Sequence, residues 1–262
     1  MDKALITNLD IDITQNCTMS CVECTKLVPA FKGTRQEEVS PEVLYKDLSN
    51  LSRAATFMWG QLLGGEPTLH RNLLECIKAV RESKVSEKVI ITTNGTLLNR
   101  ITDEIIDSID MVRISVYPGK IPVEEIDIFE KRINNRGKKL DRWFQNKFIP
   151  VYTKEPIKNI DLKVCIERNF EYKDGWMGKC YTYTDGYLCS CPTAFAINKM
   201  TKNFNVDGIF IKDDFNPQEM KEIILEESKK EYVACRNCLR CTKIESVVWR
   251  ECSKQEWERN HL

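Results

Sequence analysis

The chain has 262 residues, of which 42% are hydrophobic and 30% charged, and this is the composition of a folded globular protein. Its 39 basic and 39 acidic side chains give a formal net charge of zero, which leaves no electrostatic case for nucleic acid or a membrane surface as the main partner. No apolar run approaches the ~20 residues of a membrane span. The N-terminal residues show no signal-peptide pattern, so we expect a cytoplasmic protein.

The counts of cysteine and histidine narrow the chemistry further. There are 12 cysteines but only two histidines, His70 and His261, which argues against a histidine-based metal site or catalytic triad. Clustered cysteines in a cytosolic chain bind metal more often than they form disulfides. Nine of the cysteines lie in three groups: Cys17, Cys21 and Cys24; Cys180, Cys189 and Cys191; and Cys235, Cys238 and Cys241.

Short apolar strands alternate with amphipathic helices in the first half of the chain. A helix is expected after Ser40, which serves as N-cap, with Pro41 at the first helical position. This alternation predicts βα units and a parallel sheet, whose ligand site lies at the carboxyl ends of the strands. The expected strands are Leu5–Thr14, Thr56–Leu63, Val89–Thr92 and Met111–Tyr117.

The second half is less regular. Asp161–Ile166 is expected to be a late strand of the sheet, Tyr181–Cys191 a hairpin that turns at Asp185-Gly186, and Pro217–Tyr232 a helix. The segment Lys131–Lys147 holds seven basic residues and one acidic residue. We interpret this segment as a solvated helix face or connection, with a phosphate-contacting patch as the alternative.

The first cysteine group is a C-x3-C-x2-C run, Cys17-Thr-Met-Ser-Cys21-Val-Glu-Cys24, in the loop after the first expected strand. Three thiolates at this spacing can cap three corners of a [4Fe–4S] cluster and leave the fourth iron open to a small chelating molecule. A zinc site with a fourth ligand from elsewhere is the alternative reading of this spacing.

Three further strand ends carry polar or glycine residues. Gly64-Gly65-Glu66-Pro67 follows the second strand, where glycines let the backbone approach a ligand and Glu66 can receive an ammonium group. Thr92 and Asn94 end the third strand, and Ser115 and Tyr117 end the fourth. All of these residues are therefore expected at one edge of the sheet.

The C-x3-C-x2-C loop, the Gly-Gly-Glu-Pro turn and the Thr-Asn-Gly strand end together resemble the radical S-adenosylmethionine (radical SAM) superfamily, over roughly Leu5 to Ile166. The resemblance implies a partial (β/α)6 barrel in which Cys17, Cys21 and Cys24 bind a [4Fe–4S] cluster that chelates SAM. Gly64, Gly65 and Glu66 would hold the SAM amine, and the remaining SAM contacts would come from Thr92, Asn94, Ser115 and Tyr117. One departure is Glu23, where the family usually has an aromatic residue or a histidine.

The later cysteines resemble the SPASM/Twitch extensions of radical SAM enzymes, from about Trp176 to Cys252. The resemblance implies one auxiliary [4Fe–4S] cluster, with Cys180, Cys191, Cys235 and Cys238 as ligands and Cys241 as a substitute for one of the last two. Cys189 is expected to face the opposite side of its strand from Cys191. A zinc ribbon is the alternative. The implied division is a core over residues 1–170, a small cysteine-rich domain over 171–252 and a tail over 253–262.

These resemblances lead to a hypothesis of function. A 5′-deoxyadenosyl radical would abstract hydrogen from a small polar substrate, such as a sugar or aminocyclitol, with an external one-electron reductant such as flavodoxin or ferredoxin. Dehydrogenation would use the auxiliary cluster as electron acceptor, whereas epimerisation would need a thiol hydrogen donor, for which Cys252, Cys165 and Cys189 are the candidates. A maturase of ribosomal peptides is a second hypothesis, and a non-catalytic zinc module is a third.

Overall fold

The computed structural model describes residues 3–33, 38–163, 172–173, 176–203, 207–242 and 244–262. Nine described strands form one sheet in the order β10-β9-β8-β1-β2-β3-β4-β5, with β7 paired to β8. The strands from β8 to β5 run parallel to their neighbours in this order. The first five strands along the chain are β1 (Ala4–Thr14), β2 (Ala55–Gly64), β3 (Ser86–Thr93), β4 (Met111–Val116) and β5 (Lys139–Phe144).

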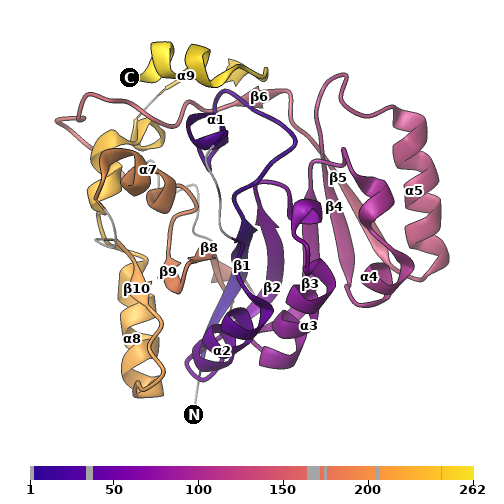
Figure 1. Cartoon of the computed structure of the whole chain (residues 1–262). Helices are drawn as coiled ribbons and strands as arrows, with labels where there is room; N and C mark the ends of the chain where they lie inside the picture. The colour runs from indigo at the N-terminus through magenta and orange to yellow at the C-terminus, as the bar shows by residue number, and fades with distance from the viewer. Residues whose placement is uncertain (1–2, 34–37, 164–171, 174–175, 204–206, 243) are drawn as a thin grey trace.

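Helices connect these parallel strands and pack along the sheet (Figure 1). Helix α2 (Pro41–Leu51) begins as the sequence predicts, because Ser40 Oγ accepts a hydrogen bond from the Val43 amide at 3.2 Å and Pro41 occupies the first helical position. Two short 3-10 helices, η1 (Pro67–Leu69) and η2 (Leu98–Arg100), lie in the loops after β2 and β3. The other main helices are α3 (Leu73–Ser83), α4 (Asp103–Asp107) and α5 (Val123–Asn135).

The main core lies between these helices and the sheet. Leu44 and Leu48 of α2, together with Ile77 and Val80 of α3, are fully buried in one apolar cluster with the inward residues of β1. Burial of each such side chain stabilises the fold by about 1.5–3 kcal/mol. The packing therefore fixes the strands, and it leaves their carboxyl ends and the loops that follow for the site.

The later strands extend the same sheet. β8 (Trp176–Thr184) and β9 (Tyr187–Cys189) form the predicted hairpin, with the left-handed residues Asp185 (φ +49°) and Gly186 (φ +81°) at its turn. β8 also runs parallel to β1, so the sheet continues across the predicted boundary at residue 170. The division into domains stays a prediction. Two-residue strands complete the sheets: β7 (Tyr172–Lys173), β10 (Ile209–Phe210), and the pair β6 (Lys147–Phe148) and β11 (Val247–Val248).

Two expected elements differ in the structure. Residues 161–163 are not a strand, because Asp161 turns its side chain onto the Lys163 amide (3.0 Å) and its own amide donates to Cys241 O (3.4 Å). The rest of that expected strand, including Cys165, lies outside the described residues. The predicted helix after Pro217 is α8 (Pro217–Glu227), which ends five residues earlier than expected, before Tyr232 enters a second core.

This second core joins the cysteine-rich segment to the C-terminus. Trp257 of α9 (Lys254–His261) is buried and stacks against Tyr152 at a ring distance of 5.9 Å. In Figure 1, α9 lies beside α1 (Val28–Phe31), which follows the first cysteine loop. The other elements here are α7 (Ala194–Thr201), η3 (Val233–Asn237) and η4 (Leu239–Cys241). The C-terminus is therefore packed against the loop that carries Cys17, Cys21 and Cys24.

Candidate active site

A cavity of about 460 Å³ opens at the carboxyl ends of β1 to β4. Its walls include all three cysteines of the first group and six of the seven residues expected to contact SAM. The lining residues from these sets are Cys17, Cys21, Cys24, Gly64, Gly65, Thr92, Asn94, Ser115 and Tyr117. The placement of motifs at successive strand ends therefore brings them together as the sequence indicates.

Gly64 and Gly65 hold the cysteine loop as well as lining the cavity. Gly64 has φ +142°, and a Cβ there would lie 2.0 Å from Thr14 O; a Cβ on Gly65 would lie 2.2 Å from Asn16 O. The Gly65 amide donates to Thr14 O at 2.8 Å. Only glycine allows this close approach, so the pair fixes the start of the cysteine loop.

Glu66 does not line the cavity. Its side chain is fully buried, and four protein groups donate hydrogen bonds to it: the Thr68 amide (3.2 Å), the Thr68 and Thr93 hydroxyls (both 2.7 Å) and the Asn94 amide (2.7 Å). Burial raises the pKa of Glu66, and these bonds oppose the rise. The carboxylate thus ties η1 to the end of β3, which does not support the expectation that it receives the SAM ammonium.

We therefore expect Glu66→Ala to lower the free energy of unfolding by about 3 kcal/mol or more, because it strands several buried donors. Glu66→Gln should also lower the free energy of unfolding, since the side-chain NH2 group of glutamine would face hydrogen-bond donors that now bind the carboxylate. Denaturant unfolding of both variants measures this. A Glu66→Gln protein with unchanged stability and weakened SAM binding would instead restore the role expected from the sequence.

Asn94 and Thr92 face the cavity in different ways. Asn94 Nδ2 donates to Thr18 Oγ1 at 2.9 Å and lies 3.6 Å from Cys17 Sγ, so this side chain positions the cysteine loop. The Thr92 hydroxyl is buried and, among the described residues, has no hydrogen-bond partner. Since buried polar atoms are rarely left unpaired, this hydroxyl fits a polar ligand in the cavity.

Burial raises the pKa of both Cys17 and Cys21 to about 12, and it also raises that of Cys24. The thiols are therefore costly to ionise without a positive partner. Iron supplies such a partner, because metal binding displaces the thiol proton. Three thiols around one open cavity, of which Cys21 is buried and Cys17 and Cys24 are half-buried, fit a cluster with a free coordination position.

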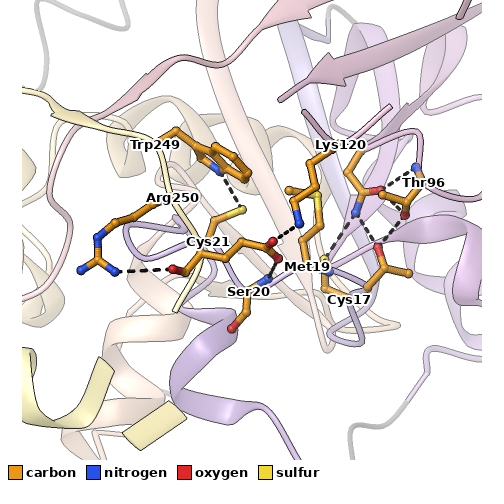
Figure 2. Close-up of polar contacts among 11 residues, drawn as sticks. Cys17, Met19, Ser20, Cys21, Thr96, Lys120, Trp249 and Arg250 are labelled. Atoms are coloured by element: carbon orange, nitrogen blue, oxygen red, sulfur yellow. Dashed lines mark hydrogen bonds and ion pairs between the residues drawn. The ribbon is translucent and has the colours of Figure 1, made fainter. Parts of the chain in front are cut away.

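The C-terminal segment closes the outer side of the cysteine loop, and no motif or spacing in the sequence indicates this contact. Residues 249–252, which we call the C-terminal strap, pair with the loop through an antiparallel bridge between Cys21 and Glu251. Figure 2 shows the Trp249 indole pointing at the sulfur of Cys21, with Nε1 and Sγ 3.1 Å apart. Glu251 accepts from the Ser20 amide at 2.9 Å and pairs with Lys120.

Glu23, the departure from the family pattern, belongs to the same contact region. Its two carboxylate oxygens bind the Val151 amide (3.1 Å) and His261 Nε2 (3.2 Å). Burial lowers the pKa of His261, but the hydrogen bonds to Glu23 and to the Trp257 carbonyl, together with the charge of Glu23, outweigh burial, and the net pKa is raised. The glutamate thus anchors α9 to the cysteine loop.

Deeper in the sheet lies a polar group that the sequence analysis missed. Asp12 pairs with Lys26 at 2.8 Å and accepts from Thr184 Oγ1 at 2.7 Å. Asp10, which lines the cavity, accepts from Gln61 Nε2 at 3.1 Å, and Gln61 in turn accepts from Arg113 at 2.9 Å. Alternating aspartates in the apolar β1 strand were the available signal for a polar interior.

Asp10 supplies a pH prediction. Burial is the main cause that raises its pKa from 3.8 to about 6, with Lys26 opposing. The stabilisation of the folded state by protonation of Asp10 is fully present below pH 3.8 and is lost as the pH rises through about 6. Relative to Asp10→Asn, the wild type should lose about 1–2 kcal/mol between pH 5 and pH 8. Urea unfolding at both pH values measures the difference, and a pH-independent difference would contradict it.

The second cysteine groups meet around a separate cavity of about 160 Å³. Its lining includes Cys191, Cys235, Cys238 and Cys241, and it shares Pro192 and Arg240 with the first cavity. Cys180 is absent from this lining. It lies instead beside Asp10 and Lys26, where burial raises its pKa well above the ordinary value.

Of the three candidate hydrogen donors, the two that the structure describes, Cys252 and Cys189, do not line the first cavity. Cys252 packs outside the cysteine loop, where its amide donates to Ser20 O at 3.0 Å. Cys189 is buried with its sulfur 3.9 Å from Asp207 O, away from the Cys191 cavity. Cys165 lies outside the described residues.

Three of the seven basic residues in the segment Lys131–Lys147 pair with neighbouring acids. Arg132 and Arg136 pair with Asp103, and Arg142 pairs with Asp127 at 2.7 Å. This agrees with a solvated connection and not with a phosphate patch. Within the described ranges, no disulfide joins the cysteines and no three Cys, His, Asp or Glu side chains converge on a single ion. None of the helices in those ranges has the length and apolar character to cross a bilayer.

Comparison with known proteins agrees with this geometry. Residues 12–125 match the family described as a 4Fe-4S single cluster domain. Curated relatives include a probable GTP 3′,8-cyclase of Pyrococcus abyssi, 28% identical over 114 residues, and one of Sulfolobus acidocaldarius, 32% identical over 115 residues. Each alignment covers 42% of this chain, but only 35% and 34% of the relative's own length.

A crystal structure of BtrN in complex with AdoMet and 2-DOIA matches with a TM-score of 0.54 and 15% identity, over 90% of this chain and 94% of that one. The fold is an α/β fold with a partial parallel barrel, and its cysteine loop can hold an iron–sulfur cluster. The family match over residues 12–125 agrees with the radical SAM resemblance of the sequence. The predicted α/β fold class is confirmed.

Proposed function

We propose that the chain is a radical SAM dehydrogenase of a small polar molecule. In this proposal Cys17, Cys21 and Cys24 hold a SAM-binding [4Fe–4S] cluster, and a Twitch-type auxiliary cluster is held by Cys191, Cys235, Cys238 and Cys241. The observation that supports it most is the pair of cysteine-lined cavities that adjoin at Pro192 and Arg240.

The protein residues supply position and exclude water, and the cofactors supply the chemistry. When bound, the first cluster with SAM would supply hydrogen-atom abstraction from a carbinol carbon, and the second cluster would supply the one-electron oxidation that completes the conversion of the carbinol to a ketone. Gly64, Gly65 and Thr92 would position SAM.

The hydroxyl proton of the carbinol also needs an acceptor, and Asp10 fits that role. Among the described residues, two carboxylates line the cavity, Asp10 and Glu23, but both oxygens of Glu23 already have protein partners. Asp10 has the pKa, about 6, that a general base needs near neutral pH. Its position in a polar interior favours a substrate that carries hydroxyl or ammonium groups.

Dehydrogenation is favoured over epimerisation by the thiol positions. Epimerisation needs a cysteine that faces the substrate, and Cys252 and Cys189 both lie away from the cavity. A soluble one-electron donor such as flavodoxin or ferredoxin stays a prediction.

Anaerobic reconstitution followed by iron, sulfide and zinc analysis tests the cofactor content. We expect iron with equimolar sulfide and, on reduction with dithionite, conversion of SAM to methionine and 5′-deoxyadenosine. Protein that takes up zinc and neither iron nor sulfide would show a zinc module.

A further inference from the structure

We propose that Trp249 tunes the reduction potential of the cluster held by Cys17, Cys21 and Cys24, by donating its indole N–H to the sulfur of Cys21. The inference rests on the proposed function only in placing that cluster. Trp249 Nε1 lies 3.1 Å from Cys21 Sγ (Figure 2). The two N–H contacts to Cys17 Sγ are longer, at 3.5 Å from Met19 N and 3.6 Å from Asn94 Nδ2.

The indole is held in this position by its neighbours. Its ring packs against that of Tyr117, which lines the cavity, at a centroid distance of 5.1 Å, and its backbone amide donates to Asn146 O at 2.9 Å. The Lys120 ammonium lies 6.0 Å from the ring centre. The indole N–H therefore cannot turn away from the sulfur unless the ring loses its packing against Tyr117.

The C-terminal strap also fixes the cysteine loop that carries the acceptor. The Val22 amide donates to Arg250 O, and the Cys252 amide donates to Ser20 O, both at 3.0 Å. These two bonds lie on either side of Cys21. The segment that carries the Trp249 donor is therefore paired in a fixed register with the segment that carries the Cys21 acceptor. Residues more than 220 positions apart in the sequence are brought together in this way.

The direction of the effect follows from charge. One-electron reduction increases the negative charge on the cluster and its thiolates, and a donated N–H stabilises the more negative state. In a half-buried site, where water screens poorly, the bond counts for more than it would in solvent. Trp249 should thus make the cluster easier to reduce.

Trp249→Phe keeps an aromatic ring against Tyr117 and removes only the N–H. In the anaerobically reconstituted full chain, the first cluster is identified by the EPR signal that changes when SAM is added. A potentiometric titration of that signal should show a lower potential in Trp249→Phe, by a roughly tenfold change in the reduction equilibrium, which is about 59 mV for one electron.

Trp257→Phe is the matched control. The Trp257 indole donates to Val22 O at 3.1 Å, next to Cys21 but not to a sulfur. The reduction potential of the first cluster in Trp257→Phe should equal that of the wild type. A wild-type potential in iron-replete Trp249→Phe, or an equal shift in both variants, would overturn the proposal while leaving the proposed function intact. A wild type without any iron–sulfur signal would overturn both.

A second measurement uses only the wild-type protein, so it does not depend on whether a variant folds. Wild-type protein labelled with ¹⁵N at tryptophan Nε1 should show a ¹⁵N hyperfine coupling in the ENDOR spectrum of the reduced first cluster. Absence of that coupling would refute the bond from Trp249 to Cys21.

Discussion

Replacing Cys17, Cys21 and Cys24 together with alanine should abolish SAM cleavage and remove about half of the iron, since two four-iron clusters give about eight irons per chain. The three sulfurs line the cavity that Gly64, Gly65 and Thr92 also line, so no other described residue set replaces them there. Iron analysis and the yield of 5′-deoxyadenosine measure the two effects.

Cys76→Ala is the matched control for this triple variant. Cys76 is fully buried on α3 with its sulfur 3.8 Å from the His70 ring, outside both cavities. Its iron content and SAM cleavage should equal those of the wild type. SAM cleavage that survives the triple substitution would remove the first cysteine group from catalysis.

The sequence predicts the first site well because its parts are local. Cys17, Cys21 and Cys24 lie within eight residues, and the glycines and Asn94 directly follow strands whose apolar patterns are clear. Parallel strands bring such ends to one edge whatever their exact register. The site could therefore be assembled before any tertiary contact was known.

Glu66 shows the limit of local reasoning. An acidic residue after two glycines suggests a ligand for an ammonium group, but the side chain instead collects donors from η1 and from the end of β3. Those donors are 27 and 28 residues away for Thr93 and Asn94, and their direction depends on how the β2 and β3 loops pack. Sequence spacing contains no information on that packing.

The surroundings of Cys180 and Trp249 could not be predicted for the same reason, at longer range. Cys180 faces Asp10 because β8 pairs in parallel with β1, in a register that sets Asn8 opposite Cys180. Trp249 reaches Cys21 because the chain returns across the cysteine loop after η4. Both contacts join residues far apart in the sequence, where no periodicity or motif indicates a neighbour.

The ligands of the auxiliary cluster give the second large expected effect. Cys191→Ser should lose about half of the iron yet still cleave SAM, because the first cavity keeps its three cysteines. Cys180→Ser should keep its full iron, since Cys180 lies beside Asp10 and not in the cavity that Cys191 lines. The two substitutions are chemically identical and eleven positions apart, so they separate cavity geometry from a general loss of thiols. Iron loss in Cys180→Ser with full iron in Cys241→Ser would restore the ligand set expected from the sequence.

The same variants separate the two reaction outcomes. In dehydrogenation, Cys191→Ser should form 5′-deoxyadenosine from SAM but little ketone from an aminocyclitol or sugar substrate, because the substrate radical has lost its electron acceptor. Epimerisation would instead require a thiol that returns hydrogen, and in deuterated water that hydrogen would carry deuterium to the inverted carbon. The positions of Cys252 and Cys189 away from the cavity favour the first outcome. Mass spectrometry of the wild-type product made in deuterated water decides between the two reactions. An oxidised product without deuterium at the carbon that lost hydrogen agrees with dehydrogenation. Deuterium at an inverted carbon would show epimerisation, and Cys165 would then be the first cysteine to replace.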